Sequence, residues 1–379
     1  MNDIPRAGLS LQDSQPARAT GLLASLHLDL PLLTGLLLLT AVGLLILYSA
    51  GEQNMQLLER QGIRFAIAYG AMVLLAQIHP DDLRRWSPWL YGLGIVLLVA
   101  TILVGQTGKG AQRWLDLGLF RFQPSEILKL ALPMMIAWYL AEKRLPPSGP
   151  RLLAAGALTL VPVLLIAKQP DLGTALLVAS AGVFALFLAG ISWQLIAALG
   201  ALMAALGPAV WFLMHDYQRQ RVLTFLNPES DPLGAGYHII QSKIAIGSGG
   251  LAGKGWLNGT QSHLEFLPER HTDFIFAVIS EEFGLVGVLA LLSLYLYIIL
   301  RGLYIASQAQ DTYGRLLAGT LTLVFFVYLF VNTGMVTGLL PVVGVPLPLI
   351  SYGGTSLVTL LAGFGILMSI HTHRKLLPT

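Results

Sequence analysis

Ten apolar runs, each long enough to cross a lipid bilayer as a helix, constrain this chain more than any other feature of its sequence. A hydrocarbon core of about 30 Å needs about 20 helical residues at a rise of about 1.5 Å each. The runs lie at about 30–50, 62–78, 88–105, 124–141, 152–168, 171–190, 194–214, 273–299, 315–337 and 352–371. The pattern predicts an all-α polytopic membrane protein with about ten transmembrane helices.

The scarcity of charge supports this class. Charged residues make up 11% of the chain, against about 25% in ordinary soluble proteins. Because the few charges gather between the apolar runs, lipid must cover much of the surface. The net charge of +3 comes without a basic stretch interleaved with aromatic residues, so nucleic acid is not an expected partner. The chain has no cysteine, which excludes disulfides, thiolate metal sites and cysteine nucleophiles.

One interval, residues 216–272, is much longer than the others and contains no run of transmembrane length. Its glycine-rich stretch, residues 247–255, is predicted to be a hinge, since no strand precedes it as a dinucleotide-binding fingerprint requires. The expected organisation is a cytoplasmic tail at 1–27, transmembrane helices 1–7 at 28–215, a large extracytoplasmic loop at 216–272, transmembrane helices 8–10 at 273–372 and a cytoplasmic tail at 373–379.

Basic residues indicate the orientation of the chain and a special property of its outer face. With a cytoplasmic N-terminus, 11 of the 23 Lys and Arg residues fall inside, a weak version of the usual bias. The bias is weak because several cations lie outside: Lys109, Arg113, Arg121, Lys129 and Lys168. Alternate helices also begin at that face and present the positive ends of their dipoles there. The outer face is therefore suited to an anion.

Three outer helix starts carry an acidic residue, namely Glu126, Asp171 and Asp273. Acids in a first turn stabilise the helix dipole by about 0.3–1 kcal/mol, so each is also explained as a simple capping residue. A carboxylate at the edge of a membrane bundle is nevertheless costly unless it is paired or faces water. Lys129 follows Glu126 by three residues, which predicts an ion pair on one helix face.

Two adjacent acids, Glu281 and Glu282, lie within the eighth apolar run. One or both are expected to face the interior of the bundle, because lipid contact would be costly. The string from His263 to Asp273 is rich in possible ligands, but it matches no zinc spacing such as H-E-x-x-H. A dedicated transition-metal site is therefore not expected.

The segment between the last two spans carries Pro341, Pro346 and Pro348, which forbid a regular helix, followed by Gly353 and Gly354. This segment resembles the signature of the SEDS family (shape, elongation, division and sporulation). Further stretches extend the resemblance: 109–116, 121–126, 167–173, 215–221, 228–255 and 264–275. It runs from the first span to Lys375, and we see no departure at a functional motif.

The resemblance implies a SEDS fold and a peptidoglycan glycosyltransferase of the bacterial inner membrane, which polymerises lipid II on the periplasmic side during cell elongation. It also implies partners beyond membrane lipid: a class B penicillin-binding protein, which is a transpeptidase, and the elongation complex. No organic cofactor is expected. Mg²⁺ or another divalent cation would fit between carboxylates and a substrate pyrophosphate.

Glycosyl transfer needs a base near the attacking hydroxyl and positive charge near the leaving group. By resemblance, Asp273 matches the family's essential aspartate and is the expected base. Candidate phosphate contacts are Arg113, Lys129, Arg221 and Lys243, while Glu126, Asp171 and Gln218 are expected to arrange the polar cavity.

Two other functions remain open at this point. A lipid II flippase would need polar groups along a path to both faces. In this sequence the polar and charged residues gather at one face. A noncatalytic scaffold for the penicillin-binding protein would need only an apolar interface, and it leaves the outer acids and bases unexplained.

Overall fold

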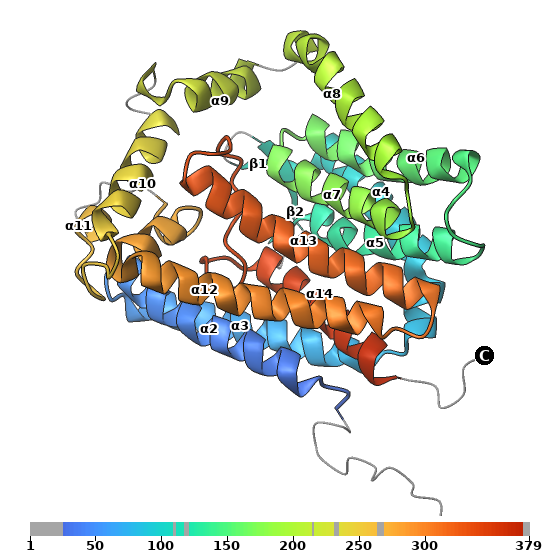
Figure 1. Ribbon diagram of the computed structural model, residues 1–379, viewed down its shortest axis with the longest axis horizontal. Coiled ribbons are helices and arrows are strands. Elements are labelled where there is room, and N and C mark those ends of the chain that lie inside the picture. Colours follow the sequence, from blue (N-terminus) through green and yellow to red (C-terminus); the bar gives the residue numbers. More distant parts are fainter. Residues whose placement is uncertain are drawn as a thin grey trace, which may run out of the picture.

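A computed structural model describes residues 26–108, 111–116, 121–213, 216–230, 235–263 and 269–373. Within these segments a long helix coincides with each predicted span: α2 (Leu30–Ala50), α3 (Met55–Ala76), α4 (Pro80–Val104), α5 (Pro124–Ala141), α6 (Gly149–Lys168), α7 (Leu172–Leu188), α8 (Trp193–Leu213), α12 (Ile275–Ser307), α13 (Thr312–Val336) and α14 (Thr355–Thr372). Figure 1 shows α12, α13 and α14 running alongside α2 and α3, with α4 to α7 grouped beside them.

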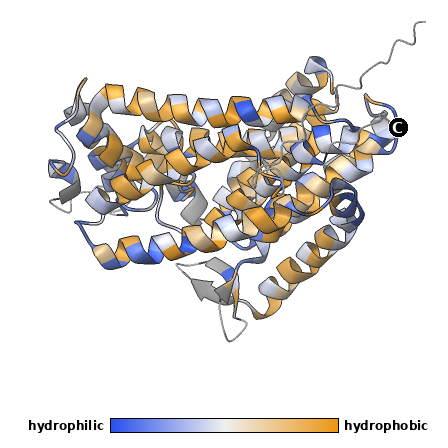
Figure 2. Cartoon of the chain, turned by 90° about the horizontal axis from the view of Figure 1, so that it is seen from below, coloured by the Kyte–Doolittle hydropathy of each residue, from blue (hydrophilic) through white to orange (hydrophobic). Residues whose placement is uncertain are grey.

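The surfaces of these helices are those of a multi-pass membrane protein. Apolar residues extend along the long helices, while hydrophilic residues gather mostly near helix ends and in loops (Figure 2). Among the described residues, six helices are long and apolar enough to cross a membrane: α2, α4, α6, α12, α13 and α14. Large aliphatic side chains such as Leu74, which is 70% exposed, cover the outside. The all-α polytopic class is confirmed, and the total of ten crossings stays a prediction.

Several helices are longer than the apolar runs that predicted them. α4 begins at Pro80 instead of residue 88, because proline suits the first helical position and Asp81 and Asp82 stabilise the first turn. α12 continues to Ser307, eight residues beyond the predicted end. Hydropathy locates the part of a helix that lies in lipid, whereas the helix itself continues into the polar boundary.

The interval between α4 and α5 forms a small antiparallel sheet that the sequence analysis did not predict. Its strands are β1 (Gln106–Gly108), β2 (Ala111–Asp116) and β3 (Arg121–Phe122), in the order β1-β2-β3. The sheet places β2, which carries Arg113, against the start of α5.

The long loop contains short elements: α9 (Asp216–Leu226), η1 (Pro228–Ser230), α10 (Ala235–Gly249) and α11 (Thr260–His263). None of these approaches transmembrane length. In Figure 1, α8 and α9 form an arch that leaves the body of the bundle and leads to α10, which packs beside α12.

The glycine-rich stretch is a strap bonded to a broken helix, and its role as a hinge stays a prediction. α12 is interrupted at Gly284, whose φ is 61°. Residues 249–255, the strap, fill the break through backbone hydrogen bonds: Lys254 N to Glu281 O (3.0 Å), Gly255 N to Glu282 O (2.9 Å), Leu285 N to Gly250 O (3.0 Å) and Val286 N to Leu251 O (3.1 Å). These bonds satisfy groups that the break would otherwise leave unpaired.

Candidate active site

A polar cavity of about 140 Å³ lies at the end of the bundle where α5, α7 and α14 begin. Its floor and walls come from these helices, from α13, from β2 and from the loop that joins α13 to α14. The lining residues are Arg113, Gln123, Glu126, Lys129, Asp171, Thr174, Leu177, Tyr328, Gly344, Val345, Pro346, Thr355 and Ser356. Four of the predicted site residues, Arg113, Glu126, Lys129 and Asp171, are thus brought together.

The first turns of three helices supply much of the polar lining. Pro124 is the first residue of α5, a position that its fixed φ suits. Asp171 caps α7, where its Oδ1 accepts a hydrogen bond from Thr174 N at 3.2 Å. α14 begins after Gly354, and no described side chain caps it. The positive ends of three helix dipoles therefore meet at one place, which favours an anion.

Glu126 and Lys129 form the predicted ion pair inside the cavity. Lys129 Nζ donates to Glu126 Oε1 at 2.8 Å, and Thr359 Oγ1 donates to Glu126 Oε2 at 2.8 Å. Both partners are less than 10% exposed. Each carboxylate oxygen of Glu126 is therefore occupied, whereas an ammonium group has three donors and this one uses a single donor on Glu126.

Asp171 organises the second charged pair. Its Oδ2 accepts a hydrogen bond from Gln123 Nε2 at 3.1 Å and lies 3.5 Å from an Arg113 terminal nitrogen. Arg113 Nε is buried and has no hydrogen-bond partner among the described residues. The guanidinium group therefore keeps donors that a ligand can use.

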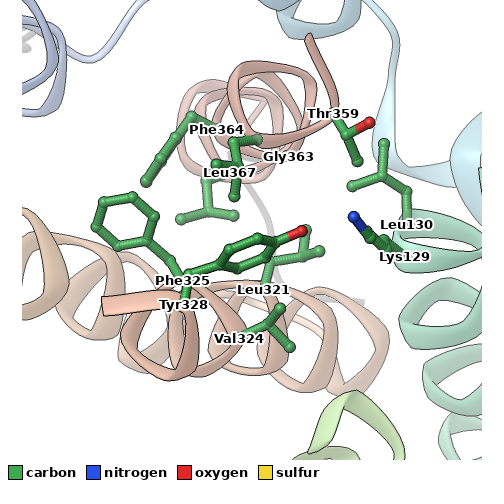
Figure 3. Close-up of a pocket in the computed structure, with 11 residues that line it drawn as sticks. Lys129, Leu130, Leu321, Val324, Phe325, Tyr328, Thr359, Gly363, Phe364 and Leu367 are labelled. Atoms are coloured by element: carbon green, nitrogen blue, oxygen red, sulfur yellow. The ribbon is translucent and has the colours of Figure 1, made fainter. Parts of the chain in front are cut away.

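Tyr328 separates the polar cavity from an apolar one. Its ring centroid lies 5.5 Å from Lys129 Nζ, and its buried hydroxyl has no hydrogen-bond partner among the described atoms. Figure 3 shows the Lys129 amine and the Tyr328 hydroxyl pointing toward each other, with Thr359 nearby. Below them a pocket of about 30 Å³ lies between α5, α13 and α14. Apart from Lys129, Tyr328 and Thr359, the side chains that line this pocket are apolar. The polar cavity therefore ends at Tyr328.

The loop at residues 341–354, here called the pocket loop, closes one side of the cavity without forming a helix, as its prolines predicted. Its backbone approaches two helices closely. A Cβ on Gly173 would lie 2.6 Å from Val343 O, and one on Gly43 would lie 2.6 Å from Leu349 O. These two glycines therefore let the loop sink into the bundle between α7 and α2.

Asp273 lies in the turn just before α12, at the edge of the cavity. The turn runs back to Glu269, which accepts backbone hydrogen bonds from Thr272 and Phe274, so the helix begins two residues after Asp273. Asp273 is half-buried. A Cβ on Gly344 would lie 3.5 Å from Asp273 Oδ2, and Gly344 also lines the cavity. Asp273 itself is not among the lining residues, and Gly344 is the residue that connects its carboxylate with the cavity.

Three predicted residues are not placed in the cavity. Lys243 is exposed on α10, and its Cε lies against Gly338, just beyond the end of α13. Gln218 and Arg221 belong to α9, but their side chains fall outside the described part of the structure. The roles proposed for these three stay predictions.

Three further residues of the site were not predicted from the sequence: Gln123, Tyr328 and Asn332. Asn332 is fully buried on α13, and its Nδ2 donates to Asp273 O and to Val345 O. A signal was present, since a carboxamide inside an apolar membrane span must find partners or face a cavity.

Comparison with known proteins identifies a family. A family of cell cycle proteins that groups FtsW, RodA and SpoVE matches residues 22–376. The chain is 60% identical over 352 residues to the peptidoglycan glycosyltransferase MrdB of Escherichia coli K12, covering 93% of this chain and 95% of that one.

Two solved structures share the fold. One chain comes from a peptidoglycan synthase complex that coordinates polymerization and crosslinking, and it matches with a TM-score of 0.80 and 35% identity, covering 92% of this chain and 99% of that one. The other is the rod shape determining protein RodA of Thermus thermophilus, with a TM-score of 0.69 and 30% identity, covering 92% and 98%. The chain therefore belongs to the SEDS family, the group that includes FtsW, RodA and SpoVE.

Proposed function

We propose that the chain is a peptidoglycan glycosyltransferase that polymerises lipid II at the periplasmic face of the bacterial inner membrane during cell elongation. The proposal rests on the position of Gly344, which lines the polar cavity and faces Asp273 Oδ2. A carboxylate thus borders a small cavity that holds Arg113 and Lys129. The activity of the 60% identical Escherichia coli relative supports the reaction class.

In this reaction the 4-hydroxyl of one saccharide attacks the anomeric carbon of another. The bond from that carbon to the lipid pyrophosphate breaks, its electron pair leaves with the pyrophosphate, and the α-linkage is inverted to β. Asp273 accepts the hydroxyl proton as general base. Arg113 and Lys129, together with the starts of α5, α7 and α14, stabilise the charge on the leaving group.

The size of the cavity suggests how the substrate is divided. At about 140 Å³ it is smaller than the roughly 300–1,000 Å³ of typical ligand pockets. It suits a pyrophosphate group, while the sugars lie outside, on the side of the long loop. In this arrangement Glu126 and Asp171 hold the cavity cations in place. Gln218, Arg221 and Lys243, on α9 and α10, are proposed to contact the substrate from the loop.

The described residues do not form a dedicated metal centre, since they contain no group of three His, Asp or Glu residues placed to hold an ion. We therefore derive no step through a metal. A divalent cation would enter as a counter-ion of the pyrophosphate, because Mg²⁺ is commonly held by one or two carboxylates plus substrate phosphates.

A class B penicillin-binding protein, acting within the elongation complex, is the proposed protein partner. The support is the similar chain found in a synthase complex that couples polymerization to crosslinking. Such a transpeptidase would cross-link the strands that this chain makes.

The decisive experiment uses purified protein, lipid II and a gel assay of glycan products, with the transpeptidase partner added or withheld. Asp273→Asn is expected to fold and to lose about 10²–10⁴-fold in polymerisation. Asp311→Asn is the matched control, because Asp311 caps α13 at the opposite end of the bundle and asparagine caps equally well. Near-normal polymerisation by Asp273→Asn would remove the base assignment. Translocation of lipid II without glycan synthesis by the wild type would instead favour a flippase.

A further inference from the structure

Asn332 connects two segments that are distant in the sequence and meet at the site. It lies on α13 and is fully buried. Its Nδ2 donates one hydrogen bond to Asp273 O at 2.9 Å and another to Val345 O at 2.8 Å. The two donors of a single amide group therefore hold the turn before α12 and the pocket loop together.

The amide oxygen of Asn332 indicates that an asparagine is present here for its two donors. Its Oδ1 is buried and accepts no hydrogen bond from the described residues. A buried acceptor without a partner is destabilising, so this residue is a poor choice for general stability. Both of its acceptors are carbonyl groups outside regular helices, and these require partners inside a membrane protein.

The two carbonyl groups belong to the proposed base and to a residue of the cavity wall. Val345 lines the polar cavity directly after Gly344, and Asp273 carries the carboxylate that faces Gly344. Asn332 therefore sets the separation between the base and the cavity wall. Neighbouring contacts, Ser351 Oγ to Thr272 O (2.6 Å) and Tyr352 N to His271 O (2.8 Å), join the same two segments but do not bond to Asp273.

We propose that Asn332 is a positioning residue for glycosyl transfer, acting through Asp273 and the pocket loop. This inference rests on the proposed function, because it requires Asp273 to be the base. Asn332 is fully buried behind the backbone that it holds, and it acts through that backbone instead of touching the reacting atoms. A displacement of about 1 Å in such a site can cost about 10²-fold in rate.

The test is Asn332→Asp, which keeps the shape of the side chain but replaces the two amide donors with an acceptor. The matched control is Thr320→Val on the same helix, since Thr320 is buried and its hydroxyl has no partner among the described residues. We expect kcat for lipid II polymerisation to fall about 10²-fold in Asn332→Asp while KM changes less than about threefold. Thr320→Val is expected to keep both constants. Thermal unfolding is recorded for every variant.

A lower melting temperature with unchanged kcat per folded molecule would overturn the inference, because it would mean a purely structural role. A rise in KM with unchanged kcat would also overturn it. If Asn332→Asp does not fold, Asn332→Ala carries the same measurement. Asp273→Asn is assayed in parallel: if it stays active, the proposed function fails, whereas if it is inactive and Asn332→Asp turns over normally, only the positioning role fails.

Discussion

The two ends of the bundle both bury carboxylate–cation pairs, and the pairs differ in geometry and in whether the cation lines a cavity. At the end where α2 begins, Arg301 donates two hydrogen bonds to Asp29, at 3.0 and 2.6 Å, and Leu32 N donates a third. Burial by itself would raise the pKa of Asp29, but these bonds outweigh it and lower the pKa. At the other end, Arg113 and Lys129 line a cavity, and Arg113 Nε has no hydrogen-bond partner among the described residues.

This difference separates a pair that serves the fold from pairs that can bind a ligand. In the bidentate Arg301–Asp29 pair the carboxylate holds the guanidinium in one geometry, although the guanidinium also keeps further N–H donors. A monodentate pair beside an open cavity can redirect a cation to an incoming phosphate without leaving its carboxylate unpaired. The prediction is that neutralising each kind of pair has the same effect on folding but a different effect on activity.

The largest effect is expected at the cavity pair. Lys129→Met leaves Glu126 buried with only Thr359 as a partner, which costs about 3–5 kcal/mol, and it also removes a phosphate contact. Polymerisation is expected to fall at least about 10²-fold, with a lower melting temperature. The double variant Glu126→Gln with Lys129→Met should regain stability but not activity, as measured by thermal unfolding and by the lipid II gel assay.

The opposite pair provides the matched control. Asp29→Asn with Arg301→Met removes both charges while keeping a capping residue at the start of α2. This double variant should regain stability and activity together. Either of two results would contradict the claim that only the cavity pair is needed for activity. The cavity double variant would polymerise lipid II at the wild-type rate, or the Asp29 double variant would be folded and inactive.

A middle-sized effect is expected at Gly344. Its φ is 72°, a left-handed conformation that costs an L-residue about 1–2 kcal/mol, and an added methyl group would contact Asp273 Oδ2. Gly344→Ala should therefore lower kcat about tenfold while the protein remains folded. Gly62→Ala on α3 is the control, because nothing lies within 4 Å of its added Cβ. A wild-type kcat for Gly344→Ala would mean that the pocket loop does not set the position of the base.

The sequence predicted those features that depend on local rules. Every apolar run became a helix, because a backbone in lipid must satisfy its own hydrogen bonds. The Glu126–Lys129 pair followed from a spacing of three residues on one helix. Glu281 and Glu282 are buried as expected, and Glu281 pairs with Lys254 at 2.7 Å.

The features that were missed depend on contacts between distant segments. The strap and the break at Gly284 exchange backbone hydrogen bonds about 30 residues apart, and backbone groups carry no residue-specific signal. Lys243 was named as a candidate phosphate contact, and its place on α10, outside the cavity lining, leaves that role a prediction. Asn332 was visible as a polar residue in an apolar span, yet its partners are two carbonyl groups that only the fold brings together.

The smallest effect is expected from pH, at the end of the bundle that carries Asp29. His373, just after α14, stacks on His27 at 3.9 Å and meets His79 edge-on at 5.2 Å between ring centroids. Burial lowers the pKa of His373, and the nearby His27 and His79 lower it further, against a weaker opposing hydrogen bond to Ser369 O. The folded state therefore favours the neutral imidazole, so this contribution to stability is complete above the ordinary pKa of 6.5. It is lost as the pH falls from there through the lower folded value.

We expect the melting temperature of the wild type to fall between pH 7 and pH 5 because of this group. His373→Asn should flatten that slope and leave polymerisation at pH 7 unchanged, since the residue lies at the opposite end from the cavity. Asp29 titrates below its ordinary pKa of 3.8, so its effect falls outside this window. A slope that is unchanged in His373→Asn would show that another group causes the pH dependence, and His27 and His79, which contact His373, would be the next residues to replace.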